Sequence, residues 1–333
     1  MRRTENILLW TLVLFFLSSA VFSQPAGKNN PKYFNPVDVF QLEFASDPQI
    51  SPDGTKIVYV RNFMDIMTDR PRSNLWMINF DGSENRPLTS GSNNYSSPRW
   101  SPDGKRLVFV SNAEGSSQVY IHWMDTGHKA KISNLMESPR NISWSPDGKS
   151  IAFSMFVPHP QKPFVKMPQK PQGAEWAKPS IYIDKVQYRQ DGQGYIRDGY
   201  TQIFILPAEG ITPRQLTSGE FNHGGSLAWT PDNKAINFSA NRHKDWEYDP
   251  QNSEIHRVSV ADGSISALTD RHGPDRSPAI SPDGKKIAYL GFNERYQGYQ
   301  VTHLYVMNID GNDSRLLIKD LDRSISLPIW SSD

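Results

Sequence analysis

The sequence predicts an all-β fold, a β-propeller built from four-stranded blades. A turn of the type Ser-Pro-Asp-Gly recurs at steps of 50, 44, 85, 51 and 50 residues, a period typical of repeat architectures. A short apolar run follows each of the first five turns, and a tryptophan directly precedes four of the six. The copies begin at Ser51, Ser101, Ser145, Thr230, Ser281 and Ser331.

Each repeat begins with a turn and continues as a buried strand. Proline presets φ at the second position of a type I turn, and Asp and Gly suit the third and fourth positions. The runs that follow are rich in β-branched and aromatic residues and too short for helices, so they predict buried strands. They are Ile57–Val60, Leu107–Val110, Ile151–Phe153, Ile236–Phe238 and Ile287–Leu290.

The second half of each repeat predicts two further strands around a glycine turn, such as Asp81-Gly82 or Asp262-Gly263. Together with the strand before the Ser-Pro-Asp-Gly turn, the unit has four strands in about 50 residues, which is one propeller blade. We expect the recurring tryptophans to pack each blade against its neighbour, because one indole ring buries a large area. These are Trp100, Trp144, Trp229 and Trp330.

Five blades and the start of a sixth are visible, and a total of seven is favoured for the full protein. The sixth turn begins at Ser331 and the sequence stops at Asp333. Blades must stack, and a propeller must protect its end strands. We therefore expect the chain to be a fragment, truncated within its propeller.

Residues 1–23 are typical of a secretory signal peptide. Arg2 and Arg3 precede a short apolar run and a small-residue end, and cleavage is expected before Gln24. An uncleaved signal anchor is the alternative interpretation. The chain contains no cysteine, so no disulfide is available. The leader favours a periplasmic or secreted protein.

Two segments follow the leader. Residues 24–46 are expected to form a linker and a short N-terminal helix, with Asn35 as its N-cap and Pro36 at its first position. The propeller is expected over 47–333, with an insertion at about 157–200.

Composition excludes several function classes. The formal net charge is +1, so nothing favours nucleic acid as a partner, or a membrane beyond the leader. The eight histidines show no metal-ligand spacing, and no phosphate-binding glycine loop is present. We therefore expect no cofactor and no metal. An acidic segment, Asp245 to Asp249, is interpreted as a solvated loop or as a receptor for a free amino group.

The 85-residue step between the third and fourth turns is the one large irregularity. It predicts one blade with an insertion that begins rich in proline, contains Trp176 and ends near a Tyr-Arg-Gln-Asp-Gly-Gln-Gly-Tyr string. Long excursions from a repeat lie on one face and often carry function. Arg189, Asp191 and Tyr195 in this string are the candidate residues for substrate gating or domain contact.

This order of leader, short helix, Ser-Pro-Asp-Gly blades and a Tyr-Arg-x-Asp-Gly-x-Gly insertion resembles the propeller of the prolyl oligopeptidase family of serine peptidases. The bacterial acylaminoacyl-peptidase and dipeptidyl-peptidase branch is the most similar. The resemblance covers the chain after its leader, and the string over 186–194 carries it. It implies that the propeller precedes an α/β-hydrolase domain with a Ser-Asp-His triad and screens peptides by size.

The sequence itself contains no candidate for that triad. The string most similar to a Gly-x-Ser-x-Gly elbow surrounds Ser226, but it lacks the last glycine and precedes a strand. The expected function is therefore a non-catalytic propeller that gates a hydrolase domain absent from this chain, with peptides and that domain as partners. Homo-oligomer formation is left open. The alternative is a stand-alone periplasmic scaffold that binds protein partners, like the propeller of the Tol system.

Overall fold

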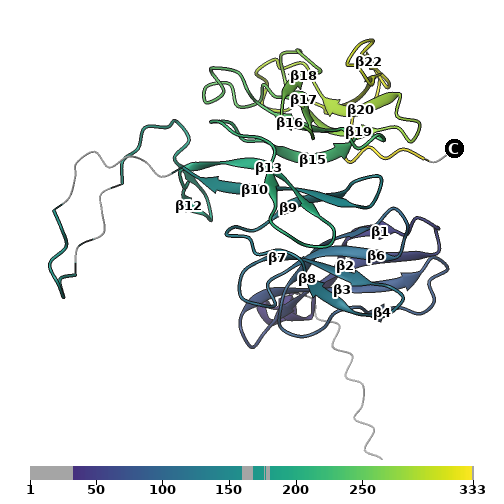
Figure 1. Ribbon diagram of the computed structural model, residues 1–333, viewed down its shortest axis with the longest axis vertical. Helices are drawn as coiled ribbons and strands as arrows, with labels where there is room; N and C mark the ends of the chain where they lie inside the picture. Colours follow the sequence, from purple (N-terminus) through teal and green to yellow (C-terminus); the bar gives the residue numbers. More distant parts are fainter. Residues whose placement is uncertain (1–32, 160–167, 176, 178–180, 332–333) are drawn as a thin grey trace, which may run out of the picture. The chain divides into compact units, whose positions relative to one another are not determined.

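A computed structural model describes residues 33–159, 168–175, 177 and 181–331 (Figure 1). The predicted signal peptide and Trp176 lie outside the described residues. The predicted short helix is a 3-10 helix, η1 (Pro36–Gln41), and none of its residues is buried. The Asp38 carboxylate accepts the Asn35 backbone N–H at 2.8 Å, which satisfies the amide at its start.

Five antiparallel four-stranded sheets follow, and we number them blades 1 to 5. Each sheet runs in chain order from its first to its fourth strand. The strands of blades 1 and 2 are β1 (Glu43–Ile50), β2 (Lys56–Asp65), β3 (Arg70–Asn79), β4 (Arg86–Pro87), β5 (Tyr95–Trp100), β6 (Arg106–Ser111), β7 (Gln118–Trp123) and β8 (Lys129–Lys131). Those of blade 3 are β9 (Arg140–Trp144), β10 (Ser150–Pro158), β13 (Gly199–Pro207) and β14 (Arg214–Gln215). Blades 4 and 5 consist of β15 (Gly224–Trp229), β16 (Ala235–Ala240), β17 (Glu254–Ser259), β18 (Ile265–Ala267), β19 (Asp275–Ile280), β20 (Lys286–Gly291), β21 (His303–Asn308) and β22 (Arg315–Leu316).

The predicted buried strands are confirmed, since all five apolar runs lie in the second strand of a blade. The first blade begins earlier than the expected boundary at residue 47. Strand β1 starts at Glu43, because Phe44 and Ser46 pair with Asn62 and Val60 on β2.

The Ser-Pro-Asp-Gly turns are closed by the same hydrogen bonds in each blade. In the first, Gly54 N–H donates to Ser51 O at 2.8 Å and Lys56 N–H donates to Ser51 Oγ at 2.9 Å. Donation from the Ser51 hydroxyl, aided by Thr55, lowers the pKa of Asp53 to about 2. In the degenerate fourth copy, Asn233 adopts φ 61°, which an asparagine tolerates better than most residues. These motifs are thus structural turns.

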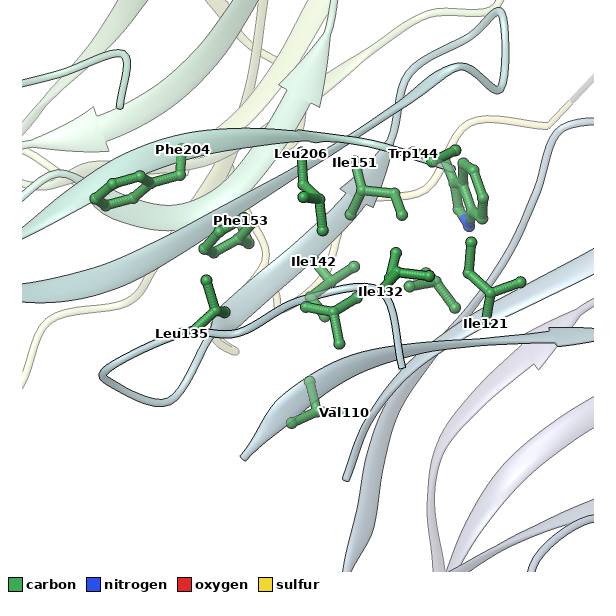
Figure 2. Close-up of a cluster of buried hydrophobic side chains, with 13 residues drawn as sticks. Val110, Ile121, Ile132, Leu135, Ile142, Trp144, Ile151, Phe153, Phe204 and Leu206 are labelled. Carbon is green, nitrogen blue, oxygen red and sulfur yellow. The ribbon is translucent and has the colours of Figure 1, made fainter. Parts of the chain in front are cut away.

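Apolar side chains fill the space between neighbouring blades. Figure 2 shows one such cluster, in which side chains of blades 2 and 3 point toward one another. Phe153 and Phe204 stack with their ring centroids 5.6 Å apart, and Ile121 and Ile151 are fully buried. Each buried aliphatic side chain stabilises the fold by about 1.5–3 kcal/mol. A blade therefore depends on its neighbour for its core.

The recurring tryptophans also join blades through hydrogen bonds. Trp100 Nε1 donates to Gln49 O at 3.0 Å, and Trp144 Nε1 donates to Arg99 O at 3.0 Å, in each case on the preceding blade. Trp330 repeats this contact with Ala279 O at 2.9 Å, although residues 317–331 contain no strand. The expected start of a sixth blade thus makes the contact that earlier blades make.

The stacked four-stranded sheets confirm the predicted all-β propeller fold. Because strands alternate in direction, the loops between second and third strands lie at the same sheet end as the linkers between blades. The insertion of blade 3 is such a loop, between β10 and β13 (Figure 1). Among the described residues, no helix is long and apolar enough to cross a membrane.

Candidate functional site

The insertion of blade 3 carries the three residues predicted to form a gating or contact site. Strands β11 (Arg189–Gln190) and β12 (Gly194–Tyr195) form a two-stranded hairpin in which Arg189 lies opposite Tyr195. Asp191 lies in the turn between these strands. All three side chains are exposed. The fold therefore brings Arg189 and Tyr195 together and places Asp191 at the tip.

Ion pairs fix the base of this insertion. Lys185 Nζ lies 3.2 Å from Asp198 Oδ1 and 5.0 Å from the centre of the Tyr200 ring. Arg197 donates two hydrogen bonds to the Glu137 carboxylate, at 2.8 and 2.9 Å. Such a bidentate pair fixes orientation as well as distance. The insertion is thus anchored both to blade 3 and to the linker that precedes it.

The outer part of the insertion exposes an apolar surface. Seven large apolar or aromatic residues within 181–196 are each 41–62% exposed, and a hollow of about 70 Å³ lies among residues of this segment. Contiguous exposed apolar surface commonly marks an interaction site. The seven residues are Ile181, Tyr182, Ile183, Val186, Tyr188, Tyr195 and Ile196.

The acidic loop of blade 4 contacts the insertion. Glu247 Oε2 accepts the Val186 backbone N–H at 3.4 Å. Asp249 Oδ2 lies 2.9 Å from His272 Nε2, whereas Asp245 is exposed. Two of the three carboxylates therefore have partners within the chain, which leaves Asp245 as the solvated one.

A hollow of about 490 Å³ lies between the first strands of blades 1 to 4. Arg99 on its wall donates to both carboxylate oxygens of Asp47, at 2.9 and 2.8 Å. Ser226 also lines this hollow, on strand β15. The element after β15 is strand β16, so Ser226 does not stand on a strand-to-helix elbow.

A buried hydrogen-bonded network lies where blade 3 meets blade 4. We call Gln202, Thr217 and His223 the 3–4 junction. Gln202 Oε1 accepts from the Thr217 hydroxyl and from His223 Nδ1, both at 2.8 Å, and Arg242 contacts the other ring nitrogen. Burial, with the nearby Arg242 charge, lowers the pKa of His223 to about 3. The imidazole is therefore neutral, with its proton on Nδ1.

The equivalent residues between blades 4 and 5 are Glu254, Thr269 and Asp275, which we call the 4–5 junction. The Thr269 hydroxyl donates to Glu254 Oε2, and Asp275, fully buried, pairs with Arg271. Burial raises the pKa of Glu254 to about 7 and that of Asp275 to about 6. Among the described residues, no cluster of three or more His, Cys, Asp or Glu could hold a metal ion.

The junction residues were missed by the sequence-based predictions, although a signal exists. In blades 1 to 4, a polar residue in the third strand is followed exactly fifteen positions later by a threonine or serine. In each of these four blades, that hydroxyl accepts the backbone N–H of the residue that follows the polar one. The pairs are Asn74 and Thr89, Gln118 and Ser133, Gln202 and Thr217, and Glu254 and Thr269.

Two family models match the chain. The first, described as the TolB beta propeller domain, matches residues 43–167, and the second, the dipeptidyl peptidase IV N-terminal region, matches 178–290. The second match covers the hairpin and both junctions. The earlier part of the propeller is therefore similar to the TolB propeller domain and the later part to the dipeptidyl peptidase IV N-terminal region.

Several of the similar proteins are peptidases. The chain is 30% identical over 61% of its length to an uncharacterized peptidase, YuxL, of Bacillus subtilis, and covers 30% of it. It is 24% identical over 95% of its length to dipeptidyl-peptidase 5 of Porphyromonas gingivalis, and covers 47% of it. An acylaminoacyl peptidase structure from Pyrococcus horikoshii matches the fold with a TM-score of 0.64 at 18% identity, over 86% of this chain and 41% of that one.

These matches confirm the resemblance seen in the sequence. The chain is thus similar to the propeller of the prolyl oligopeptidase family of serine peptidases, and the match of 178–290 to the dipeptidyl peptidase IV N-terminal region supports that resemblance most directly. It spans less than half the length of both of these relatives.

Proposed function

We propose that the chain is the non-catalytic propeller of a secreted or periplasmic serine peptidase, where it gates peptide access to a Ser-Asp-His hydrolase domain. The match to the dipeptidyl peptidase IV N-terminal region over 178–290 carries this proposal. That match includes the hairpin with Arg189, Asp191 and Tyr195.

The geometry of the insertion supports a role in contact or gating. The base of the insertion is held by two ion pairs, Lys185 with Asp198 and Arg197 with Glu137. These pairs fix the point at which the hairpin leaves blade 3. Its outer surface presents apolar and aromatic groups, which suit a domain surface or an extended peptide. Arg189 and Asp191 add charges that could orient a peptide backbone or terminus.

The complete protein tests this proposal. A fluorophosphonate probe should label the complete protein but not residues 1–333 expressed alone. Failure to label the complete protein would remove the peptidase assignment. Labelling of residues 1–333 would instead show that this part has a nucleophile, with Ser226 as the first candidate.

A second experiment tests the hairpin itself. Replacing Arg189 and Tyr195 together by alanine should change kcat/KM several-fold for long peptides and much less for dipeptide or acylated amino-acid substrates. Met67→Ala is the matched control, because Met67 is 88% exposed in the equivalent loop of blade 1. An equal effect on all substrates would argue against gating by the hairpin.

The export proposal has its own measurement. Mass spectrometry of the mature protein from the cell envelope or medium should give Gln24 as the first residue. A protein recovered with residues 1–23 still attached would favour a signal anchor instead.

A second candidate function is a stand-alone envelope scaffold, which the match of 43–167 to the TolB propeller domain favours. The reading frame after Asp333 distinguishes the two. A Gly-x-Ser-x-Gly elbow followed by Asp and His would support the peptidase, and a stop codon soon after a sixth blade would support the scaffold.

A further inference from the structure

The 4–5 junction leaves two buried carboxylate oxygens without a hydrogen-bond partner among the described residues. Glu254 and Asp275 are 4% and 0% exposed. Among the described residues, Glu254 Oε1 and Asp275 Oδ2 have no hydrogen-bond partner. An unpaired charged oxygen in the interior carries a large desolvation cost. A bound proton would remove much of that cost.

The hydrogen bonds of Thr269 also favour a proton bound at this junction. Its hydroxyl donates its one hydrogen to Glu254 Oε2 and accepts the Ile255 backbone N–H at 2.9 Å. Thr269 is also within hydrogen-bonding reach of the Asp275 carboxyl group. One hydroxyl hydrogen cannot serve two carboxylates at once, so this hydroxyl can bond to both carboxyl groups only if one of the two carries a proton of its own.

We propose that Glu254 and Asp275 share one proton, which makes the 4–5 junction a proton-binding site that holds blades 4 and 5 together and loosens when the proton leaves. Two carboxyl groups confined to one buried site cannot both ionise without strong repulsion. The pair titrates as a unit.

Within the pair, Glu254 is the favoured site of the shared proton. Arg271 pairs with Asp275 and stabilises its ionised form. A protonated Glu254 has the shape and the donor capacity of a glutamine, which is the residue that blade 3 carries at this place, as Gln202. Burial raises the pKa of Glu254 to about 7, opposed by the hydrogen bond from Thr269 and reinforced by the Asp275 charge.

Other charged groups surround the pair from every packed element. The loop after β16 contributes His243, whose Nε2 lies 3.6 Å from Glu254 Oε1, and Arg242. The linker before β19 contributes Asp270 and Arg271. Asp270 opposes ionisation of both carboxyl groups, whereas Arg271 favours it. The groups on the strands are His256, Tyr289 and Tyr305, of which Tyr305 lies with its ring centre 4.0 Å from the Arg271 guanidinium carbon.

The direction of the pH effect follows from the raised pKa of Glu254. The unfolded glutamate titrates near 4.5 and the folded one near 7, so the folded state binds the proton more tightly. This contribution to stability is complete below pH 4.5 and is lost as the pH rises through about 7. Above that pH both carboxyl groups are ionised and the junction opens more often.

Hydrogen exchange on the complete protein measures that opening locally. In the wild type, exchange of peptides covering 254–259 and 275–280, corrected for the intrinsic pH dependence of exchange, should rise about tenfold or more from pH 5.5 to 8. In Glu254→Gln the same peptides should show no such rise, because the amide cannot ionise. Glu209→Gln, at an exposed glutamate in a turn of blade 3, should behave like the wild type.

A spectroscopic readout protects the test against a variant that folds poorly. In the wild type, the infrared carbonyl band of a buried protonated carboxylic acid should be present at pH 6 and lost by pH 9. The proposal is overturned if wild-type exchange in these peptides is independent of pH, if Glu254→Gln keeps the rise, or if no such band is present at pH 6.

Discussion

The 3–4 and 4–5 junctions share the same backbone hydrogen bonds but bury different polar side chains. Both use a threonine hydroxyl that accepts a backbone N–H at 2.9 Å, fifteen positions after a buried polar residue. His223 N–H donates to Thr201 O at 2.8 Å, and Asp275 N–H donates to Ser253 O at 2.7 Å. One junction is completed by an amide and a neutral imidazole, and the other by two carboxyl groups. The repeat therefore fixes where polar groups are buried but not which ones.

The two junctions should respond to pH in opposite directions. His223 keeps a pKa of about 3 in the folded state against 6.5 when unfolded, so its contribution is present above pH 6.5 and is lost as the pH falls through about 3. The contribution of Glu254 is lost as the pH rises through about 7. One pKa unit corresponds to about 1.4 kcal/mol, so between pH 5 and 8 each effect amounts to about 2–3 kcal/mol. Acid weakens one junction and alkali the other.

The largest expected loss of stability comes from adding a side chain at Gly291, which lies against the carboxyl pair. A Cβ atom at Gly291 would overlap Arg271 and the Pro274 carbonyl, both next to Asp275. Gly291→Ala should therefore lower the free energy of unfolding by about 3 kcal/mol, as measured by chemical denaturation.

The equivalent position in blade 4 provides the matched control. Ala240 lies there, opposite Glu254, and its position has room for a methyl group. Ala240→Gly should cost only about 1 kcal/mol, chiefly through backbone entropy. Equal costs at the two positions would show that the 4–5 junction is not specially crowded.

The next largest effect on stability is expected when the 3–4 junction is given a carboxyl group like that of the 4–5 junction. Gln202 Nε2 donates to Gly219 O at 3.0 Å, and a glutamate would lose this donor when ionised. Gln202→Glu should lower the free energy of unfolding by about 2 kcal/mol at pH 8 and by clearly less at pH 5. Gln193→Glu, at an exposed site in the hairpin turn, should change little at either pH. A loss that is the same at pH 5 and pH 8 would contradict the comparison.

The smallest effect concerns the tryptophan contact. Trp229 Nε1 donates to Ser143 O across blades 3 and 4 at 3.4 Å, whereas blade 5 has Ile280 at the equivalent position. Trp229→Phe should cost about 0.5–1 kcal/mol, since the ring is kept and only a long hydrogen bond is lost. Trp100→Phe, which removes a 3.0 Å bond, should cost more in the same denaturation experiment. A larger cost for Trp229→Phe than for Trp100→Phe would show that the indole hydrogen bond does not determine how strongly the blades are held together.

The sequence was sufficient for features that depend on local chemistry. The strand over Ile57–Val60 follows from a turn whose proline and glycine preset the backbone. The hairpin carrying Arg189 and Tyr195 lies within the segment identified by the failed repeat spacing. The burial of Glu254 and Asp275 could not be predicted, because it depends on how blades 4 and 5 and the linker between β18 and β19 pack together around them. A carboxylate next to polar residues looks solvated in a sequence, and only tertiary packing shows otherwise.

The opposite pH responses of the two junctions can be measured in a single wild-type sample. Hydrogen exchange of the complete protein at pH 5 and pH 8, corrected for intrinsic rates, reports both junctions through peptides over 202–207 and 254–259. We expect the first peptide to open more at pH 5 and the second to open more at pH 8. Opening that changes in the same direction at both junctions, or at neither, would contradict the account.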